Sequence, residues 1–181
     1  MVYNSNIRHR KSMRLKGYDY SQNGLYFVTI CVNNRKHLLG HINNGIIELN
    51  NNGEIVRGCW LSITEHFPNV RLHDFVVMPN HIHGIIEITA HVDESAGVQN
   101  FEPLPAQPLK NAYQHIIPRS IGSIIRGFKI GATKQIGYSI WQRNYHERII
   151  RDDESYNEIA EYIQTNPLCW NDDRYYDEVL G

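Results

Sequence analysis

The 181-residue sequence lacks both a membrane-spanning segment and an export signal. No apolar run approaches the ~20 residues that a membrane helix needs. The basic, polar N-terminus has no apolar stretch of the kind found in signal peptides. We therefore expect a cytoplasmic protein that does not enter a membrane.

Cysteine is scarce, and its spacing argues against two kinds of protein. Cys31, Cys59 and Cys169 are odd in number, far apart and in no zinc-type spacing. This pattern supports neither a disulfide framework nor a cysteine-ligated metal site. It indicates reduced thiols, as in cytoplasmic proteins.

Net charge is nearly absent too, at a formal value of -1, so bulk charge gives no case for nucleic-acid binding. The distribution of charge is uneven, however. Acids dominate from Asp152 onward, where Arg174 is the only base, whereas five bases and no acid lie near the start: Arg8, Arg10, Lys11, Arg14 and Lys16. The basic cluster predicts a polyanionic partner, and a solvated, disordered terminus is the alternative.

Length and composition fit one domain, because 181 residues with 41% hydrophobic content can bury a single core. We divide the chain into a basic N-terminal arm (1–17), one domain (18–168) and an acidic C-terminal tail (169–181). Residues 90–118 are rich in glycine, proline and polar residues without any period, and they predict a long loop within the domain.

The apolar patterns predict an α+β domain with a mostly antiparallel sheet and helices packed on it. The expected strands are 25–32, a hairpin around Asn43–Gly45 with its return strand 46–49, 70–78, 81–88, and a short strand or extended segment within 140–150. The expected helices are 54–67, 120–137 and a third that follows Asp152 and is stopped by Pro167.

Two histidines one residue apart begin the strand after the Pro79-Asn80 turn. Alternate strand residues share a face, so His81 and His83 point the same way and the intervening isoleucine points the other. Two imidazoles side by side can begin a metal site, which then needs a ligand from elsewhere in the chain. The alternative is a purely structural histidine pair.

The third helix offers that ligand. Tyr162 lies at the margin of the apolar stripe, and Asn166 is four residues further on the same side of the helix. If this helix packs beside the histidine strand, the Asn166 amide oxygen and two imidazoles form a mixed N/O set that suits Mg²⁺ or Mn²⁺. Alternatively, Tyr162 is an ordinary core or surface residue and Asn166 only ends the helix.

These residues also carry a family resemblance. Pro79-Asn80-His81-Ile82-His83-Gly84 and the distant Tyr162-Ile163-Gln164-Thr165-Asn166-Pro167 resemble the single-tyrosine HUH transposases, especially the REP-associated tyrosine transposases of the IS200/IS605-like superfamily. The residues 10–15, 17–20 and 26–29, and the segment Trp141–Arg148, are similar to the same family in the same order.

The resemblance implies a ferredoxin-like fold of the HUH endonuclease type that acts on single-stranded DNA with REP-like hairpins. It implies His81 and His83 as paired metal ligands, Asn166 as the third ligand and Tyr162 as the nucleophile. The family leaves a 5′-phosphotyrosine on the protein and a free 3′-OH on the DNA. The long loop and the short acidic tail depart from the family pattern.

The chemistry favours strand transfer over digestion. A tyrosine ester of a phosphate stays activated, so a 3′-OH can attack it and rejoin DNA without an external energy source. Arg8, Arg10, Lys11 and Arg14 of the arm, with Arg126 and Lys129 of the second helix, are the expected DNA contacts. The sequence leaves open whether the protein is a monomer or a homodimer.

Two other functions remain open at this point. One is a metal hydrolase of another kind built on the His-x-His pair, although no further histidine or aspartate follows closely after His83. The other is a non-catalytic protein of the same descent that binds structured DNA.

Overall fold

The computed structural model describes residues 22–90 and 117–176. Its strands are β1 (Gly24–Cys31), β2 (Gly40–Asn43), β3 (Ile46–Leu49), β4 (Val70–Val77), β5 (His81–Ile88) and β6 (His146–Ile150). Its helices are α1 (Asn51–Leu61), α2 (Ile63–His66), α3 (Ile121–Ile136) and α4 (Asp153–Thr165), with 3-10 turns at Asn33–Arg35 and Trp170–Asp172. The predicted arm, nearly all of the predicted loop and the end of the predicted tail lie outside the described residues.

Four strands form the main sheet in the order β4-β5-β1-β6, and every neighbouring pair is antiparallel. This order is that of a ferredoxin-like split βαβ arrangement, with β2 and β3 forming a separate hairpin after β1. The predicted α+β class with an antiparallel sheet is therefore confirmed. In the register, Thr29 on β1 lies opposite both His83 on β5 and His146 on β6.

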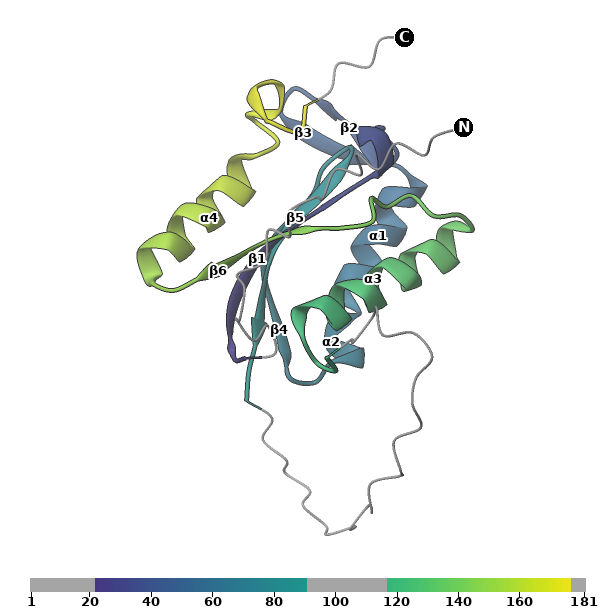
Figure 1. Cartoon of the computed structure of the whole chain (residues 1–181). Helices are drawn as coiled ribbons and strands as arrows, with labels where there is room; N and C mark the ends of the chain where they lie inside the picture. The colour runs from purple at the N-terminus through teal and green to yellow at the C-terminus, as the bar shows by residue number, and fades with distance from the viewer. Residues whose placement is uncertain (1–21, 91–116, 177–181) are drawn as a thin grey trace, which may run out of the picture.

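The sheet is covered on both faces, as Figure 1 shows. Helices α1 and α3 pack on one face, where Trp60 and Phe128 join alternate residues of β1 and β5 in the larger core. Helix α4 packs on the other face through Ile159 and Ile163, which meet Ile85 of β5. Because successive strand residues alternate between these cores, one face of β5 packs against α1 and α3 and the other face packs against α4.

Gly84 permits the closest contact between α1 and the sheet. A Cβ at this position would lie 2.3 Å from Cζ2 of Trp60, so any larger residue would push the indole away. Trp60 is fully buried and its ring stacks on Phe75 at 5.8 Å. The glycine between the histidine pair and Ile85 thus has a packing role on the opposite face from the histidines.

Two predicted elements differ in extent from those observed. The helix expected at 54–67 begins at Asn51, because the Asn50 side chain caps it by accepting from the Gly53 amide, and it is divided at Ser62 into α1 and α2. The segment expected to be extended over 140–150 forms a strand only from His146. Within it, the carbonyls of Gln142 and Asn144 accept hydrogen bonds from Lys129 instead of from a neighbouring strand.

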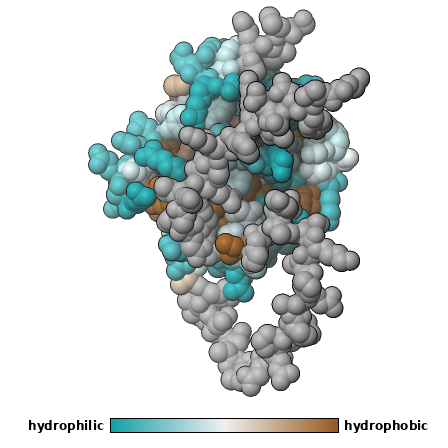
Figure 2. Space-filling model, in the orientation of Figure 1, coloured by the Kyte–Doolittle hydropathy of each residue, from teal (hydrophilic) through white to brown (hydrophobic). Residues whose placement is uncertain are grey.

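The outer surface of α4 is polar. Its exposed acids include Glu154, Glu158 and Glu161, and the helix contains no base. Figure 2 shows mainly hydrophilic residues on the described surface at the left, where α4 lies in Figure 1. Across residues 22–90 and 117–176, none of the helices has the length and apolar character needed to cross a membrane.

Candidate metal and tyrosine site

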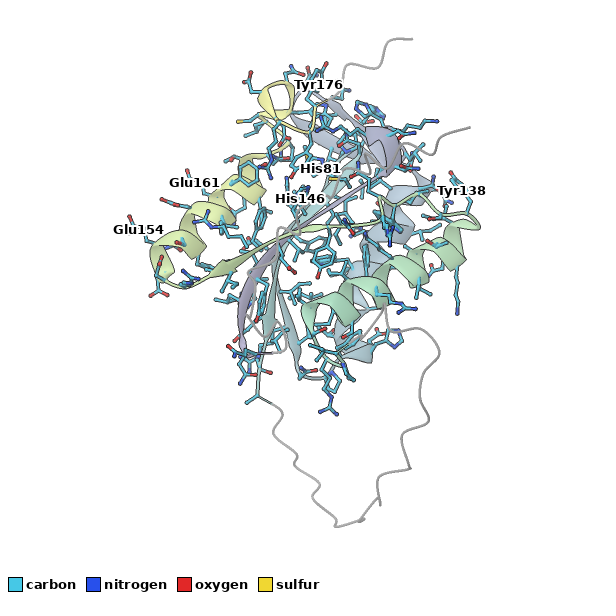
Figure 3. The ribbon with its side chains drawn as sticks, in the orientation of Figure 1. His81, Tyr138, His146, Glu154, Glu161 and Tyr176 are labelled. Atoms are coloured by element: carbon cyan, nitrogen blue, oxygen red, sulfur yellow. The ribbon has the colours of Figure 1, made fainter. Side chains whose placement is uncertain are left out.

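The β5 strand holds His81 and His83 side by side on the face that α4 covers. Both imidazoles are buried, and their ring centroids are 4.4 Å apart. Figure 3 shows His81 and His146 in the interior of the molecule, between α4 and the helices of the opposite face. The strand alternation predicted from the sequence therefore brings the two histidines together.

Asn80 determines which nitrogen of His81 carries the proton. The Asn80 amide nitrogen donates to the backbone carbonyls of Arg35 and Tyr175, so its oxygen faces His81 Nδ1 at 2.7 Å and accepts a hydrogen bond from the Nδ1–H group. Nε2 of His81 is then a bare lone pair, and it has no hydrogen-bond partner among the described residues. An oriented imidazole with a free, buried lone pair is what a metal ligand requires.

His83 lies between Thr29 and Tyr162. Its Nδ1 is 2.8 Å from the Thr29 hydroxyl oxygen, and its Nε2 is 3.2 Å from the Tyr162 hydroxyl oxygen. Because the Tyr162 hydroxyl donates to Asp173, His83 has two options: Nε2–H donates to the phenol oxygen, or Nδ1–H donates to Thr29 and the Nε2 lone pair is free for a cation. Phe27 supports this arrangement by stacking on the His83 ring at 5.4 Å.

Helix α4 carries the two other predicted site residues. Asp152 caps its first turn by accepting from the Ser155 amide at 2.8 Å. Tyr162 is 38% exposed, as expected for the margin of the apolar stripe, while Asn166 is 2% exposed at the C-terminal end. The Asn166 Oδ1 is buried and has no hydrogen-bond partner among the described residues.

A polar cluster on β4 fixes where α4 lies. Asp74 accepts hydrogen bonds from Gln164 at 2.8 Å and from Tyr156 at 3.4 Å, two turns apart on the helix. The Tyr156 hydroxyl also lies 3.1 Å from His73, whose other nitrogen meets Glu87 at 3.0 Å. His73 and Asp74 lie within a shift of strand register, where such bulges commonly redirect side chains.

Asp173 is the site residue that sequence reasoning missed. Its Oδ2 accepts hydrogen bonds from the Tyr162 hydroxyl at 3.1 Å and from the Asn166 side-chain amide at 2.5 Å. Its Oδ1 accepts from the backbone amide of Tyr175 at 2.6 Å. The residue lies in the predicted acidic tail, whose sequence has no pattern that places it near the histidines.

The first part of that tail packs directly on the histidines. Tyr175 is 5% exposed, and its ring centroid lies 4.8 Å from His81 and 5.6 Å from His83. Trp170 lies 6.0 Å from His81 on another side. Residues 169–176 therefore form part of the wall of the site.

The residues present fit a divalent cation. Ligand atoms of His81, His83 and Asp173 all lie within 4.8 Å of one another. The unpartnered Nε2 of His81 is a buried lone pair that a cation would satisfy, and Asn166 meets the group through its amide nitrogen, which donates to Asp173. Two imidazoles and a carboxylate form a mixed N/O set suited to a divalent cation, with water or phosphate completing the shell.

The electrostatics keep both imidazoles neutral. Burial lowers the pKa of His81 to about 4, with Arg174 and Arg35 adding to the effect and Asp173 opposing it. Burial and the neighbouring His81 lower the pKa of His83 well below its usual range. Neutral imidazoles are the form that binds metal ions.

The Tyr162 phenol, in contrast, is held in its protonated form, which is a poor nucleophile. Burial raises the pKa of its phenol, and the negative charge and hydrogen bond of Asp173 raise it further, with Arg174 opposing. The phenol is therefore protonated at neutral pH unless positive charge enters the site.

Of the predicted DNA contacts, two lie in the part of the chain that the structure describes. Arg126 and Lys129 are on α3, which covers the opposite face of the sheet from the histidines. Arg126 is exposed, whereas Lys129 is partly buried. The four predicted contacts of the arm, Arg8, Arg10, Lys11 and Arg14, lie outside the described residues.

Comparison with known proteins gives the family. No protein-family model matches the chain. An uncharacterized protein of Haemophilus influenzae (strain ATCC 51907 / DSM 11121 / KW20 / Rd) is 45% identical over 179 residues, which are 96% of this chain and 97% of that protein. The chain belongs to the same family as this protein.

Two further comparisons confirm the relationship to the REP-associated tyrosine transposases that the sequence motifs predicted. A protein of the same Haemophilus strain, provisionally named a REP-associated tyrosine transposase, is 26% identical over 152 residues, covering 83% of this chain and 73% of that protein. A solved structure of a REP-associated tyrosine transposase bound to a REP hairpin shares the fold, with a TM-score of 0.57 at 22% identity over 86% of this chain and 73% of that one. The predicted HUH transposase-type fold is thereby confirmed.

Proposed function

We propose that this protein is a metal-dependent tyrosine transposase that cleaves and rejoins single-stranded DNA bearing REP-like hairpins. The observation that carries the proposal is the contact between the Tyr162 hydroxyl and Nε2 of His83 at 3.2 Å. The Tyr162 hydroxyl, which is the proposed nucleophile, thus lies next to His83, one of three residues whose ligand atoms could hold a metal ion. The hairpin-bound relative of the same fold supports a hairpin substrate.

In the proposed reaction, the Tyr162 oxygen attacks a backbone phosphorus. A bond forms between that oxygen and phosphorus, and the bond from phosphorus to the 3′ oxygen of the preceding nucleotide breaks. The leaving oxygen takes up a proton and becomes a free 3′-OH, while the 5′-phosphate stays on the tyrosine. Attack by another 3′-OH reverses these steps and joins two DNA ends.

His81, His83, Asn166 and Asp173 are the proposed holders of the cation. When bound there, Mg²⁺ or Mn²⁺ would supply positive charge that polarises the phosphate oxygens and favours the Tyr162 phenolate. Asp173 Oδ2 already accepts the phenolic hydrogen bond and is placed to receive its proton. Asn80 keeps the His81 lone pair directed at the same position.

The test follows each half of a cleaved strand. A hairpin oligonucleotide labelled at its 3′ end becomes attached to the protein in a denaturing gel with Mn²⁺, because the fragment after the cut carries the 5′-phosphate. The same oligonucleotide labelled at its 5′ end yields a shorter free fragment. Adducts that carry the 5′ label, or cleavage that persists in EDTA, would contradict the proposed chemistry.

A non-catalytic protein that binds structured DNA is the second candidate. It is favoured by the hydrogen bonds through which Asp173 engages both Tyr162 and Asn166. In this case hairpin DNA binds with no adduct under any metal condition, and Tyr162→Phe changes nothing measurable.

A further inference from the structure

A basic hollow lies between α3 and the segment 139–145. Its volume is about 670 Å³. Four cationic side chains line it, and none of its described lining residues is acidic; the four are Arg126, Lys129, Lys134 and Arg143. A concave surface with cations and no anions is complementary to a polyanion.

Lys129 builds the wall of this hollow. Its ammonium donates to the backbone carbonyls of Gln142 at 2.9 Å and Asn144 at 3.0 Å, and it lies 5.9 Å from the Tyr145 ring centroid. These bonds hold the 142–145 segment against α3. Arg126, Lys134 and Arg143 are exposed and remain available to a ligand.

Charge also distinguishes the two sides of the protein. Helix α3 contains no acid and α4 contains no base. Figure 3 shows Glu154 and Glu161 projecting outward from α4, on the far side of the sheet from α3. A nucleic acid is therefore repelled from the outer surface of α4 and attracted to the hollow.

The wall of the hollow is joined to the main sheet. Trp141 forms a β-bridge with Val32, and the Gln142 amide donates to the carbonyl of Cys31, which lies opposite His81 in the sheet. The same segment continues into β6, which begins at His146. The wall of the hollow therefore adjoins the end of the sheet at which His81 lies, on the opposite face from the histidine side chains.

We propose that the hollow binds an unpaired stretch of DNA next to the hairpin, with its phosphates on Arg126, Lys134 and Arg143. A hollow of about 670 Å³ can hold a short stretch of a single strand, whereas a duplex is too wide to enter it. Tyr145, which is partly exposed in the lining, offers aromatic contact to bases, as in other single-strand grooves. The inference rests on the proposed function, since it takes DNA as the ligand.

The test compares a hairpin that carries a single-stranded flank with the same hairpin made blunt. Binding is measured by fluorescence anisotropy in EDTA, where no cleavage occurs. We expect the wild-type protein to bind the flanked form roughly tenfold more tightly. The triple variant Arg126→Gln/Lys134→Gln/Arg143→Gln binds both forms alike and shows a log–log salt slope smaller by about 2. Arg71→Gln and Arg151→Gln, which replace exposed arginines elsewhere, behave as wild type.

Three results would overturn the inference. One is a triple variant that keeps the preference for the flank while its melting curve matches wild type. Another is equal loss of both DNA forms, which would assign these cations to the stem. A third is binding of a flank made of RNA that is as tight as binding of the DNA flank and is lost in the same triple variant.

Photo-crosslinking tests the location of the strand independently. With 5-iodouracil in the flank, we expect adducts on peptides that contain Trp141 or Tyr145, and adducts confined to other peptides would contradict the inference. Failure of the proposed function is distinguishable from failure of this inference. A wild-type protein that forms no tyrosine adduct but retains flank-dependent binding would contradict the proposed catalysis and leave the binding inference intact.

Discussion

Tyr162 donates a hydrogen bond to Asp173, at 3.1 Å, across a sequence separation of eleven residues. The same carboxylate oxygen accepts from Asn166. One side chain from the segment after α4 thus contacts both residues of α4 that the family motif singles out. Its charge disfavours the phenolate, and its position allows it to accept the proton that the phenol must lose.

Tyr162→Phe removes only the hydroxyl, so we expect loss of the covalent DNA adduct with hairpin affinity unchanged. The matched control is Tyr156→Phe, on the same helix, whose hydroxyl contacts His73 and Asp74 rather than His83. Mass spectrometry of the adduct peptide identifies the modified residue. An adduct that persists in Tyr162→Phe would show that another tyrosine is the nucleophile.

Asp173→Asn keeps the shape of the side chain and removes its charge. We expect a higher Mn²⁺ concentration for half-maximal cleavage, because a charged ligand is lost. At saturating Mn²⁺ we expect a lower maximal rate, because the proposed proton acceptor is lost, and a pH profile that moves to lower pH, because Asp173 raises the pKa of Tyr162. Unchanged Mn²⁺ affinity with faster cleavage at every pH would instead show that Asp173 inhibits cleavage.

Asn80→Leu removes the acceptor that holds the proton on Nδ1 of His81. Changes of such supporting partners typically cost 10–100-fold in metal affinity, and we expect a loss of roughly that size for Mn²⁺, measured by electron paramagnetic resonance. Asn80→Asp retains an acceptor oxygen and is the matched control. Equal losses in the two variants would show that the hydrogen bond to His81 is not what matters.

Asp74→Ala removes the anchor of α4 on β4 without touching the histidines. We expect the free energy of unfolding to fall by about 1 kcal/mol for each lost hydrogen bond and the cleavage rate to fall with it. Mn²⁺ affinity stays constant, because Asp74 contacts Gln164 and Tyr156 rather than the ligand atoms. Glu161→Ala, an exposed change on the same helix, is the control. A weaker Mn²⁺ site in Asp74→Ala would show that the anchor serves the metal ligands too.

The buried histidines predict loss of stability in acid. In the unfolded chain an imidazole binds a proton near pH 6.5, whereas burial lowers the pKa of folded His81 to about 4. Between these values the unfolded state binds more protons, so stability falls as pH falls, by about 1.4 kcal/mol per pH unit for each such histidine.

Urea unfolding of the metal-free protein at pH 7, 6 and 5 measures this slope. His81→Gln is expected to reduce it by the contribution of one imidazole. The same slope in the variant and the wild type would assign the acid sensitivity to other groups.

Local periodicity was enough to predict the part of the site that lies within single elements. The two-residue repeat of a strand places His81 and His83 together whatever surrounds them. The helical repeat puts Tyr162 and Asn166 on one side of α4, and the Pro167 that follows limits the length of the helix. The order of strands and helices then made an antiparallel α+β fold the natural arrangement.

Tertiary structure alone decided the rest. Residues 169–176 have no apolar period, so nothing in their sequence shows that Asp173 turns back toward histidines some ninety positions earlier. The side chain of Lys129 has the same sequence signature as a surface lysine, yet it turns inward to two carbonyls whose position depends on how β6 begins. Contacts of this kind arise from the packing of distant segments, which is a property of the whole chain and not of any repeat within it.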